Sequence, residues 1–182
     1  MKGPLLLILF LCILVNANAQ DSSYRQLLNL TREVAMADSI LPDQLKPMTR
    51  VDSSLVRSLF PALVSSGNNP FKNRVYTSSG RISQYENFDL YFITENRRRA
   101  DSSSMSTTWL VSLKKTGDYI SSIKVVVSGT KKRSGYNIRS VLYPDNRIFI
   151  DTRIMTGEKL FEQQENYRIT KTGRFILAEK NQ

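Results

Sequence analysis

The sequence contains no histidine and a single cysteine, Cys12, and these two scarcities exclude most familiar catalytic and metal sites. Without histidine there is no Ser-His-Asp or Cys-His nucleophile system, no imidazole general base and no imidazole metal ligand. One cysteine forms neither an intrachain disulfide nor a cysteine-based zinc or iron-sulfur site. Carboxylates, lysine, tyrosine and hydroxyl groups are what remains for chemistry, and we predict no cofactor and no metal.

Long apolar runs are also missing, except at the N-terminus, where Lys2 precedes an unbroken apolar stretch at positions 5–15 and then Ala17 and Ala19. A positive residue, a short apolar core and small residues at positions −3 and −1 are typical of a cleaved signal peptide. A membrane anchor is the alternative, but this stretch would span only ~16 Å of a ~30 Å hydrocarbon core. We predict cleavage after Ala19 and a secreted or periplasmic protein with no transmembrane segment after cleavage.

Cys12 raises the alternative of a lipoprotein, in which the cysteine becomes the acylated first residue. Phe10 and Leu11 stand before it, where a lipid-attachment site needs a small residue, and Cys12 lies inside the apolar run. We therefore do not expect acylation. The rest of the chain, residues 20–182, has a length and an apolar fraction that fit one compact domain.

Charge divides this domain into two parts. Residues 20–71 contain five basic and five acidic residues, whereas residues 72–182 contain 20 basic and 11 acidic residues. Essentially all of the net positive charge therefore belongs to the second part.

Hydrophobic periodicity changes at about the same place. Apolar residues recur at three-to-four spacing in residues 23–38 and, after Asp52 or Ser53 as a cap, in residues 55–63, which predicts two helices before the polar loop 65–70. From about Val75 the chain has short runs rich in β-branched and aromatic residues, with turn signals between them. Such short connections require antiparallel neighbours.

We therefore predict an α+β fold: two N-terminal helices followed by an antiparallel β-meander of about seven strands, as an open sheet or a partly closed barrel. Its organisation would be a signal peptide at 1–19 and a single domain at 20–182, helical over 20–69 and a meander over 70–182.

Residues 84–175 contain a recognisable order of strand and turn motifs. An aromatic strand at 88–92 is followed by Trp109 to Leu113, by Lys-Lys-Thr-Gly-Asp-Tyr-Ile-Ser-Ser-Ile at 114–123, and by a closing Tyr167-Arg168-Ile169 and Gly173-Arg174-Phe175. The arrangement resembles uncharacterised small secreted proteins and lipoproteins of Bacteroidetes. That resemblance implies export and a β-rich fold, and it implies no activity and no role for any residue.

Basic residues cluster between the expected strands. The candidate contacts for an anionic partner are Arg97, Arg98, Arg99, Lys114, Lys115, Lys131, Lys132 and Arg133. If the loops converge, they would suit an anionic glycan, a lipid headgroup or an acidic protein. The alternative is that charged loops serve solubility and discourage edge pairing. Nucleic acid is not expected, because no aromatic residues are interleaved with the basic ones. Successive loops of a meander alternate ends, so convergence depends on the strand count.

Acidic residues are the remaining route to catalysis. The candidates are Glu86 with Asp89, Asp151, and Glu162 with Glu165. They alternate with apolar residues beside arginine and lysine, which predicts solvent-facing carboxylates in cross-strand ion pairs. We therefore predict a non-catalytic binding or interaction module. The alternatives are a carboxylate-dependent hydrolase of envelope or dietary polymers and an inhibitor of a secreted enzyme.

Overall fold

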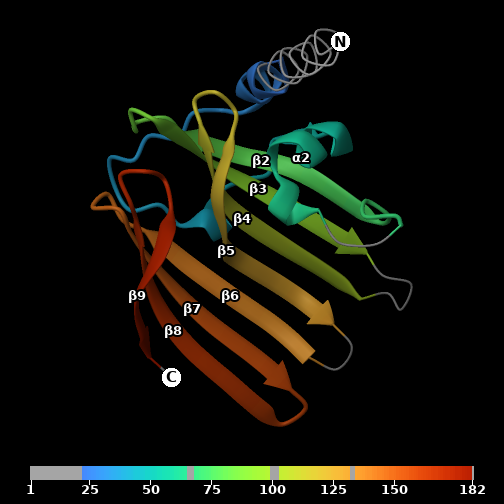
Figure 1. The fold of residues 1–182 in the computed structure, drawn as a ribbon. Coiled ribbons are helices and arrows are strands. Elements are labelled where there is room, and N and C mark those ends of the chain that lie inside the picture. The colour runs from blue at the N-terminus through green and yellow to red at the C-terminus, as the bar shows by residue number, and fades with distance from the viewer. Residues whose placement is uncertain (1–21, 65–67, 99–102, 132–133, 182) are drawn as a thin grey trace, which may run out of the picture.

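The computed structural model describes residues 22–64, 68–98, 103–131 and 134–181. Nine strands form one antiparallel sheet in which each strand pairs with the next along the chain, from β1 to β9 (Figure 1). Within these residues the sheet is open, and β1 and β9 are its two edges.

Residues 22–30 are helical. The further elements are η1 (Pro42–Gln44), β1 (Thr49–Val51), α2 (Ser53–Leu59), η2 (Pro61–Leu63), β2 (Arg74–Ile82), β3 (Phe88–Arg98), β4 (Ser104–Lys114), β5 (Tyr119–Lys131), β6 (Ser134–Leu142), β7 (Arg147–Thr156), β8 (Lys159–Ile169) and β9 (Phe175–Asn181).

The connections alternate between two ends of the sheet because successive strands are antiparallel. We call the end with the β3–β4, β5–β6 and β7–β8 connections the distal end; it lies at the lower right in Figure 1. The opposite, proximal end carries the β2–β3, β4–β5, β6–β7 and β8–β9 connections. Left-handed residues make two of these turns tight: Asn146 has φ 69° and Gly157 has φ 60°.

A first hydrophobic cluster lies between the helical segments and β1–β4. Leu27, Val56 and Leu59 have no exposed surface in this cluster. Each such side chain contributes about 1.5–3 kcal/mol through its removal from water. The buried members are Tyr24, Leu27, Val51, Leu55, Val56, Leu59, Phe60, Leu63, Tyr76, Tyr91, Ile93, Val111 and Leu113.

A second cluster joins the opposite face of β3 to β6, β7 and β8. Phe88, Leu90 and Phe92 of β3 belong to it, so β3 is buried on both faces. The segment between the helical residues and β1 closes this cluster, since Ile40 and Leu142 exchange backbone hydrogen bonds of 2.8 and 2.9 Å. The buried members are Met36, Ile40, Ile82, Phe88, Leu90, Phe92, Leu110, Val125, Leu142, Ile148, Ile150 and Ile169.

The predicted α+β fold, with two N-terminal helices and then about seven strands, is wrong. The described chain is mostly β, with short helices and nine strands, and β1 precedes α2. The helix predicted over 23–38 stops at residue 30 because the next residues bond to the edge of β2. Val34 donates its N–H to the Arg81 carbonyl at 2.7 Å, and Arg81 donates to the Arg32 carbonyl at 2.9 Å. This edge is free because β1 pairs with residues 76–78 only.

Candidate functional site

The meander brings two of the three basic clusters to one end of the sheet. Arg97 and Arg98 end β3, and Lys131 ends β5, so both clusters lie at the distal end. Arg97 pairs with Met105, which pairs with Gly129, so the clusters are two strands apart, or about 10 Å. Three further candidates, Arg99, Lys132 and Arg133, lie outside the described residues.

Two arginines of this end have no ion-pair partner among the described carboxylates. Arg98 is exposed and Arg97 is half-buried. Arg74 of the neighbouring strand differs, because its Nη1 lies 2.6 Å from Oε1 of Glu95. The charge of Arg97 and Arg98 is thus not compensated within the described sheet.

A shallow groove of about 480 Å³ lies beside the β5–β6 and β7–β8 hairpins. Arg153, one of its lining residues, forms ion pairs with two carboxylates, 3.2 Å from Asp151 and 3.3 Å from Glu162. The groove is lined by Gly129, Thr130, Gly135, Tyr136, Asn137, Arg153, Met155, Leu160 and Glu162. Most of the surface that lines the groove is apolar.

Exposed apolar residues flank the β7–β8 turn, which the sequence analysis missed, and we call this part of the hairpin its tip. Met155 pairs with Leu160, and Ile154 pairs with Phe161. The exposed fractions are 47% for Met155, 53% for Leu160 and 47% for Phe161. The signal available in the sequence is the adjacent pair Leu160-Phe161, which breaks the alternation expected of a half-buried strand.

The third basic cluster lies at the proximal end and has local partners. Lys114 is 3.3 Å from Asp118 within the β4–β5 turn. Lys115 lies 3.6 Å from Asp89, a buried carboxylate of β3. These two lysines are therefore separated by the length of the strands from the other candidates.

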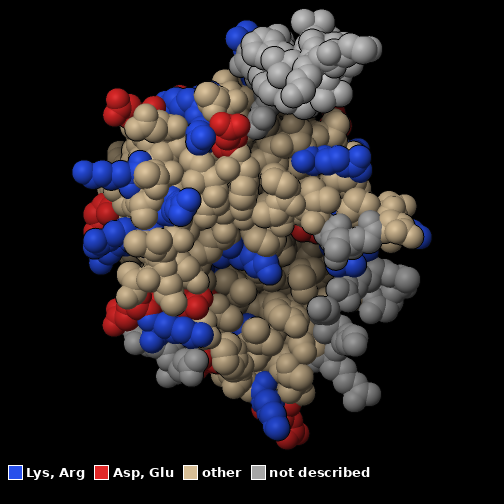
Figure 2. Space-filling model, viewed as in Figure 1, with Lys and Arg blue, Asp and Glu red and all other residues tan. Residues whose placement is uncertain are grey.

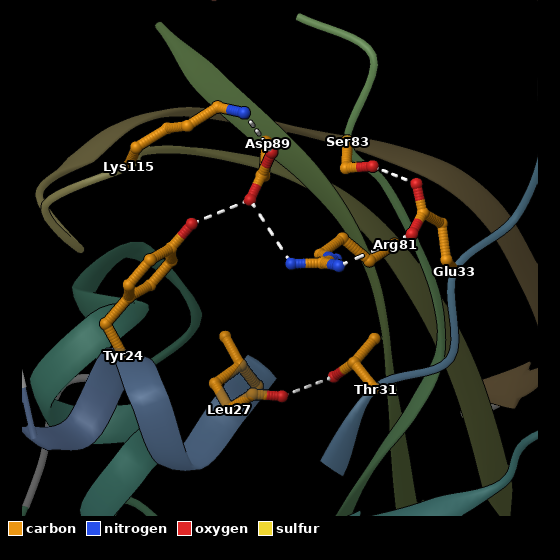
Figure 3. A network of polar contacts seen from close by, with 8 residues as sticks. All are labelled: Tyr24, Leu27, Thr31, Glu33, Arg81, Ser83, Asp89 and Lys115. Atoms are coloured by element: carbon orange, nitrogen blue, oxygen red, sulfur yellow. Dashed lines mark hydrogen bonds and ion pairs between the residues drawn. The ribbon is translucent and has the colours of Figure 1, made fainter. Parts of the chain in front are cut away.

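Asp89 is the centre of a buried polar network that connects the helix to the sheet (Figure 3). Tyr24 donates a 2.7 Å hydrogen bond to Oδ2 of Asp89, and Nη1 of Arg81 lies 3.6 Å from the same oxygen. Arg81 also reaches Glu33 at 3.7 Å, and Glu33 accepts a hydrogen bond from Ser83. Two cations and one hydroxyl thus compensate a carboxylate that is only 2% exposed.

Tyr24 of this network and the neighbouring Tyr91 stay protonated at neutral pH. Burial raises the pKa of Tyr24 far above its ordinary value, and the hydrogen bond to Asp89 raises that pKa further. Burial raises the pKa of Tyr91 to about 12. The two rings meet edge to face, with centroids 6.4 Å apart. The network therefore holds residues 22–30 against β3.

Glu86 and Asp89, the first carboxylate pair considered in the sequence, lie in different environments. Glu86 lies exposed in the β2–β3 turn, whereas Asp89 is buried with its own cations. Asp89 thus differs from the predicted solvent-facing position because the helix covers its face of β3. In the part of the chain that the structure describes, no three acidic side chains gather as a metal site would require.

Comparisons with known proteins give no relative for this chain. No family model matches the sequence, and no curated protein and no solved structure is similar to it. Among the described residues there is no helix with the length and apolar character needed to cross a membrane.

Proposed function

We propose that this protein is an exported, non-catalytic binding module that engages an anionic partner through the distal end of its sheet. The observation that carries the proposal is the common location of Arg97, Arg98 and Lys131 at the ends of neighbouring hairpins. The groove lined by Tyr136 and Leu160 lies at the same end.

Electrostatics supports one shared binding surface. The two hairpins are only ~10 Å apart, so one extended anionic partner can contact both clusters at once, each within the Debye length of about 8 Å at physiological salt. Charges on separate loops add in the field that steers an anionic partner to the surface. Lys114 and Lys115 make no part of this surface, because their charges lie at the proximal end beside carboxylates.

The test is binding to heparin, used as a sulfated polyanion, with two double variants of equal net charge. Arg98→Glu with Lys131→Glu reverses one charge in each of two distal hairpins, β3–β4 and β5–β6. Lys171→Glu with Arg174→Glu reverses two exposed charges in the β8–β9 turn at the proximal end. We expect the distal variant to bind about tenfold more weakly and the proximal variant to bind nearly as the parent does.

Circular dichroism and thermal melting first establish that both variants fold. If the two folded variants elute from heparin at the same salt concentration, net charge alone governs binding and the proposed distal surface is refuted.

A further inference from the structure

The β7–β8 hairpin projects at the distal end with apolar side chains on both of its faces. Side chains of successive strand residues point to opposite faces. The cross-strand pair Met155 and Leu160 therefore lies on one face, and the pair Ile154 and Phe161 lies on the other. A hairpin that only closes a sheet has no need of exposed apolar residues on both faces.

Strand register places basic residues at the same level as this tip. Lys131 pairs with Ser134, Ser134 with Thr156, and Thr156 with Lys159. Lys131 and Lys159 thus share one row across the sheet, about 14 Å apart. Leu160 and Phe161 lie one and two residues from that row, within about 7 Å.

Charged groups gather along the left margin of the face shown in Figure 2, and a basic and an acidic group also project at its lower end. Glu158 and Lys159 of the β7–β8 turn are exposed, so the apolar residues of the hairpin lie beside charges of both signs. An exposed apolar element next to cationic groups is the pattern by which proteins bind the interface of an anionic membrane. Neither feature by itself would select a lipid surface over a soluble polyanion.

We infer that the distal end binds an anionic lipid surface. Leu160 and Phe161 enter the boundary between headgroups and acyl chains, and the exposed Arg98 and Lys159 lie at the level of the lipid phosphates. The inference rests on the proposed function, since it names the anionic partner of the same surface. Insertion removes apolar side chains from water, while the basic residues gain favourable contact with negative charge.

The experiment measures binding to vesicles of phosphatidylcholine alone and of phosphatidylcholine with phosphatidylglycerol. Leu160→Ser with Phe161→Ser tests the tip. Ile176→Ser with Leu177→Ser is the matched control on β9, because these side chains are 48% and 49% exposed, like those of the tip. We expect the tip variant to bind the anionic vesicles at least about tenfold more weakly. We expect the control to bind as the parent does, and the parent to bind the neutral vesicles weakly.

A depth-sensitive readout keeps the test independent of a folding defect. Phe161→Trp should shift its emission to shorter wavelength and be quenched by brominated lipid when anionic vesicles are added, whereas Ile176→Trp should not. If the tip variant binds like the parent and Phe161→Trp shows no shift, the lipid inference is wrong. In that case a loss of heparin binding by Arg98→Glu with Lys131→Glu still supports the proposed function. If that charge variant keeps its binding to both heparin and anionic vesicles, the proposed function fails as well.

Discussion

Asp89 shows how one buried charge can be tolerated in a small β-domain. Its carboxylate is taken out of water, which is costly unless each oxygen finds a partner. Tyr24 and Arg81 contact Oδ2, whereas Oδ1 has only the Lys115 ammonium at 3.6 Å and accepts no hydrogen bond within the described residues. The partners come from the helix, β2 and the β4–β5 turn, so the carboxylate ties three elements together.

Removing the tyrosine hydroxyl should therefore weaken the fold measurably. Tyr24→Phe keeps the ring in the first cluster and removes the 2.7 Å hydrogen bond to Asp89. Hydrogen bonds to charged groups contribute about 1.5–3 kcal/mol, and we expect a loss of that size in urea unfolding. Tyr136→Phe, at the distal end, is the control and should change the free energy of unfolding much less. A Tyr24→Phe protein as stable as the parent would show that Asp89 is held without it.

The same tyrosines predict a loss of stability in alkali. The pKa of Tyr91 rises from 10.0 to about 12 in the folded protein, and that of Tyr24 rises in the same direction. Above about pH 10 the unfolded chain releases phenol protons that the folded chain keeps. The free energy of unfolding should then fall by about 1.4 kcal/mol per pH unit for each tyrosine.

Urea unfolding between about pH 8 and 11 measures this dependence. Stability from these groups is fully present below pH 10 and is lost as the pH rises toward the folded-state pKa. Tyr91→Phe should reduce the fall in the free energy of unfolding per pH unit above about pH 10. Tyr136→Phe should reduce it less. An unchanged slope in Tyr91→Phe would contradict the prediction.

Local residue patterns could not have identified the Asp89 network. In the sequence, Asp89 stands between Phe88 and Leu90 in simple alternation, which predicts a solvent-facing carboxylate. Its burial depends on residues 22–30 covering that face of β3, a contact 65 residues away along the chain. Hydrophobic periodicity shows which residues of a strand share a face. It does not show which other part of the chain covers that face.

At the scale of elements, the later strands were the most predictable part. The turn signals at 144–146, 156–158 and 171–173 separate β6, β7, β8 and β9 as the structure has them. The segment after residue 30 was not predictable, because its apolar residues fit both a helix and an extended strap. The open edge of β2 decides between the two by accepting backbone hydrogen bonds from Val34.

Alanine substitutions at two glycines of the distal end test whether β4 and β5 must approach each other closely there. Gly129 has φ 123°, and a Cβ on it would meet the Ser104 carbonyl oxygen and, at 3.0 Å, the Cα of Met105. Gly135 has open space at the same position. We expect Gly129→Ala to destabilise the protein by about 1–3 kcal/mol, whereas Gly135→Ala changes stability by no more than about 0.5 kcal/mol. Denaturant unfolding measures both, and equal effects would show that β4 and β5 can move apart at no cost.

For the whole molecule, the number of strands between two basic clusters decides whether they lie at the same end of the sheet. The basic clusters were visible in the sequence, but their convergence was not. One strand, β4, separates the cluster at Arg97 from that at Lys114, and β5 separates the latter from the cluster at Lys131, so the first and last in the chain share one end and the one between them does not. Arg97 and Lys131 are therefore neighbours in space because the number of strands between them is even, which local pattern alone does not establish.

The last prediction concerns the N-terminus of the mature protein. The apolar stretch at 5–15 is too short to span a bilayer, and Ala17 and Ala19 suit signal peptidase. Cleavage after Ala19 would also preserve Tyr24 and Leu27, which are buried in the first cluster, so processing leaves the core complete. Intact-mass measurement of protein exported from its native host should give residues 20–182, and Ala19→Arg should retain the longer form. A parent mass that includes residues 1–19, or an acyl chain on Cys12, would contradict cleavage after Ala19. In either case all or part of the N-terminal segment would remain attached to the exported domain.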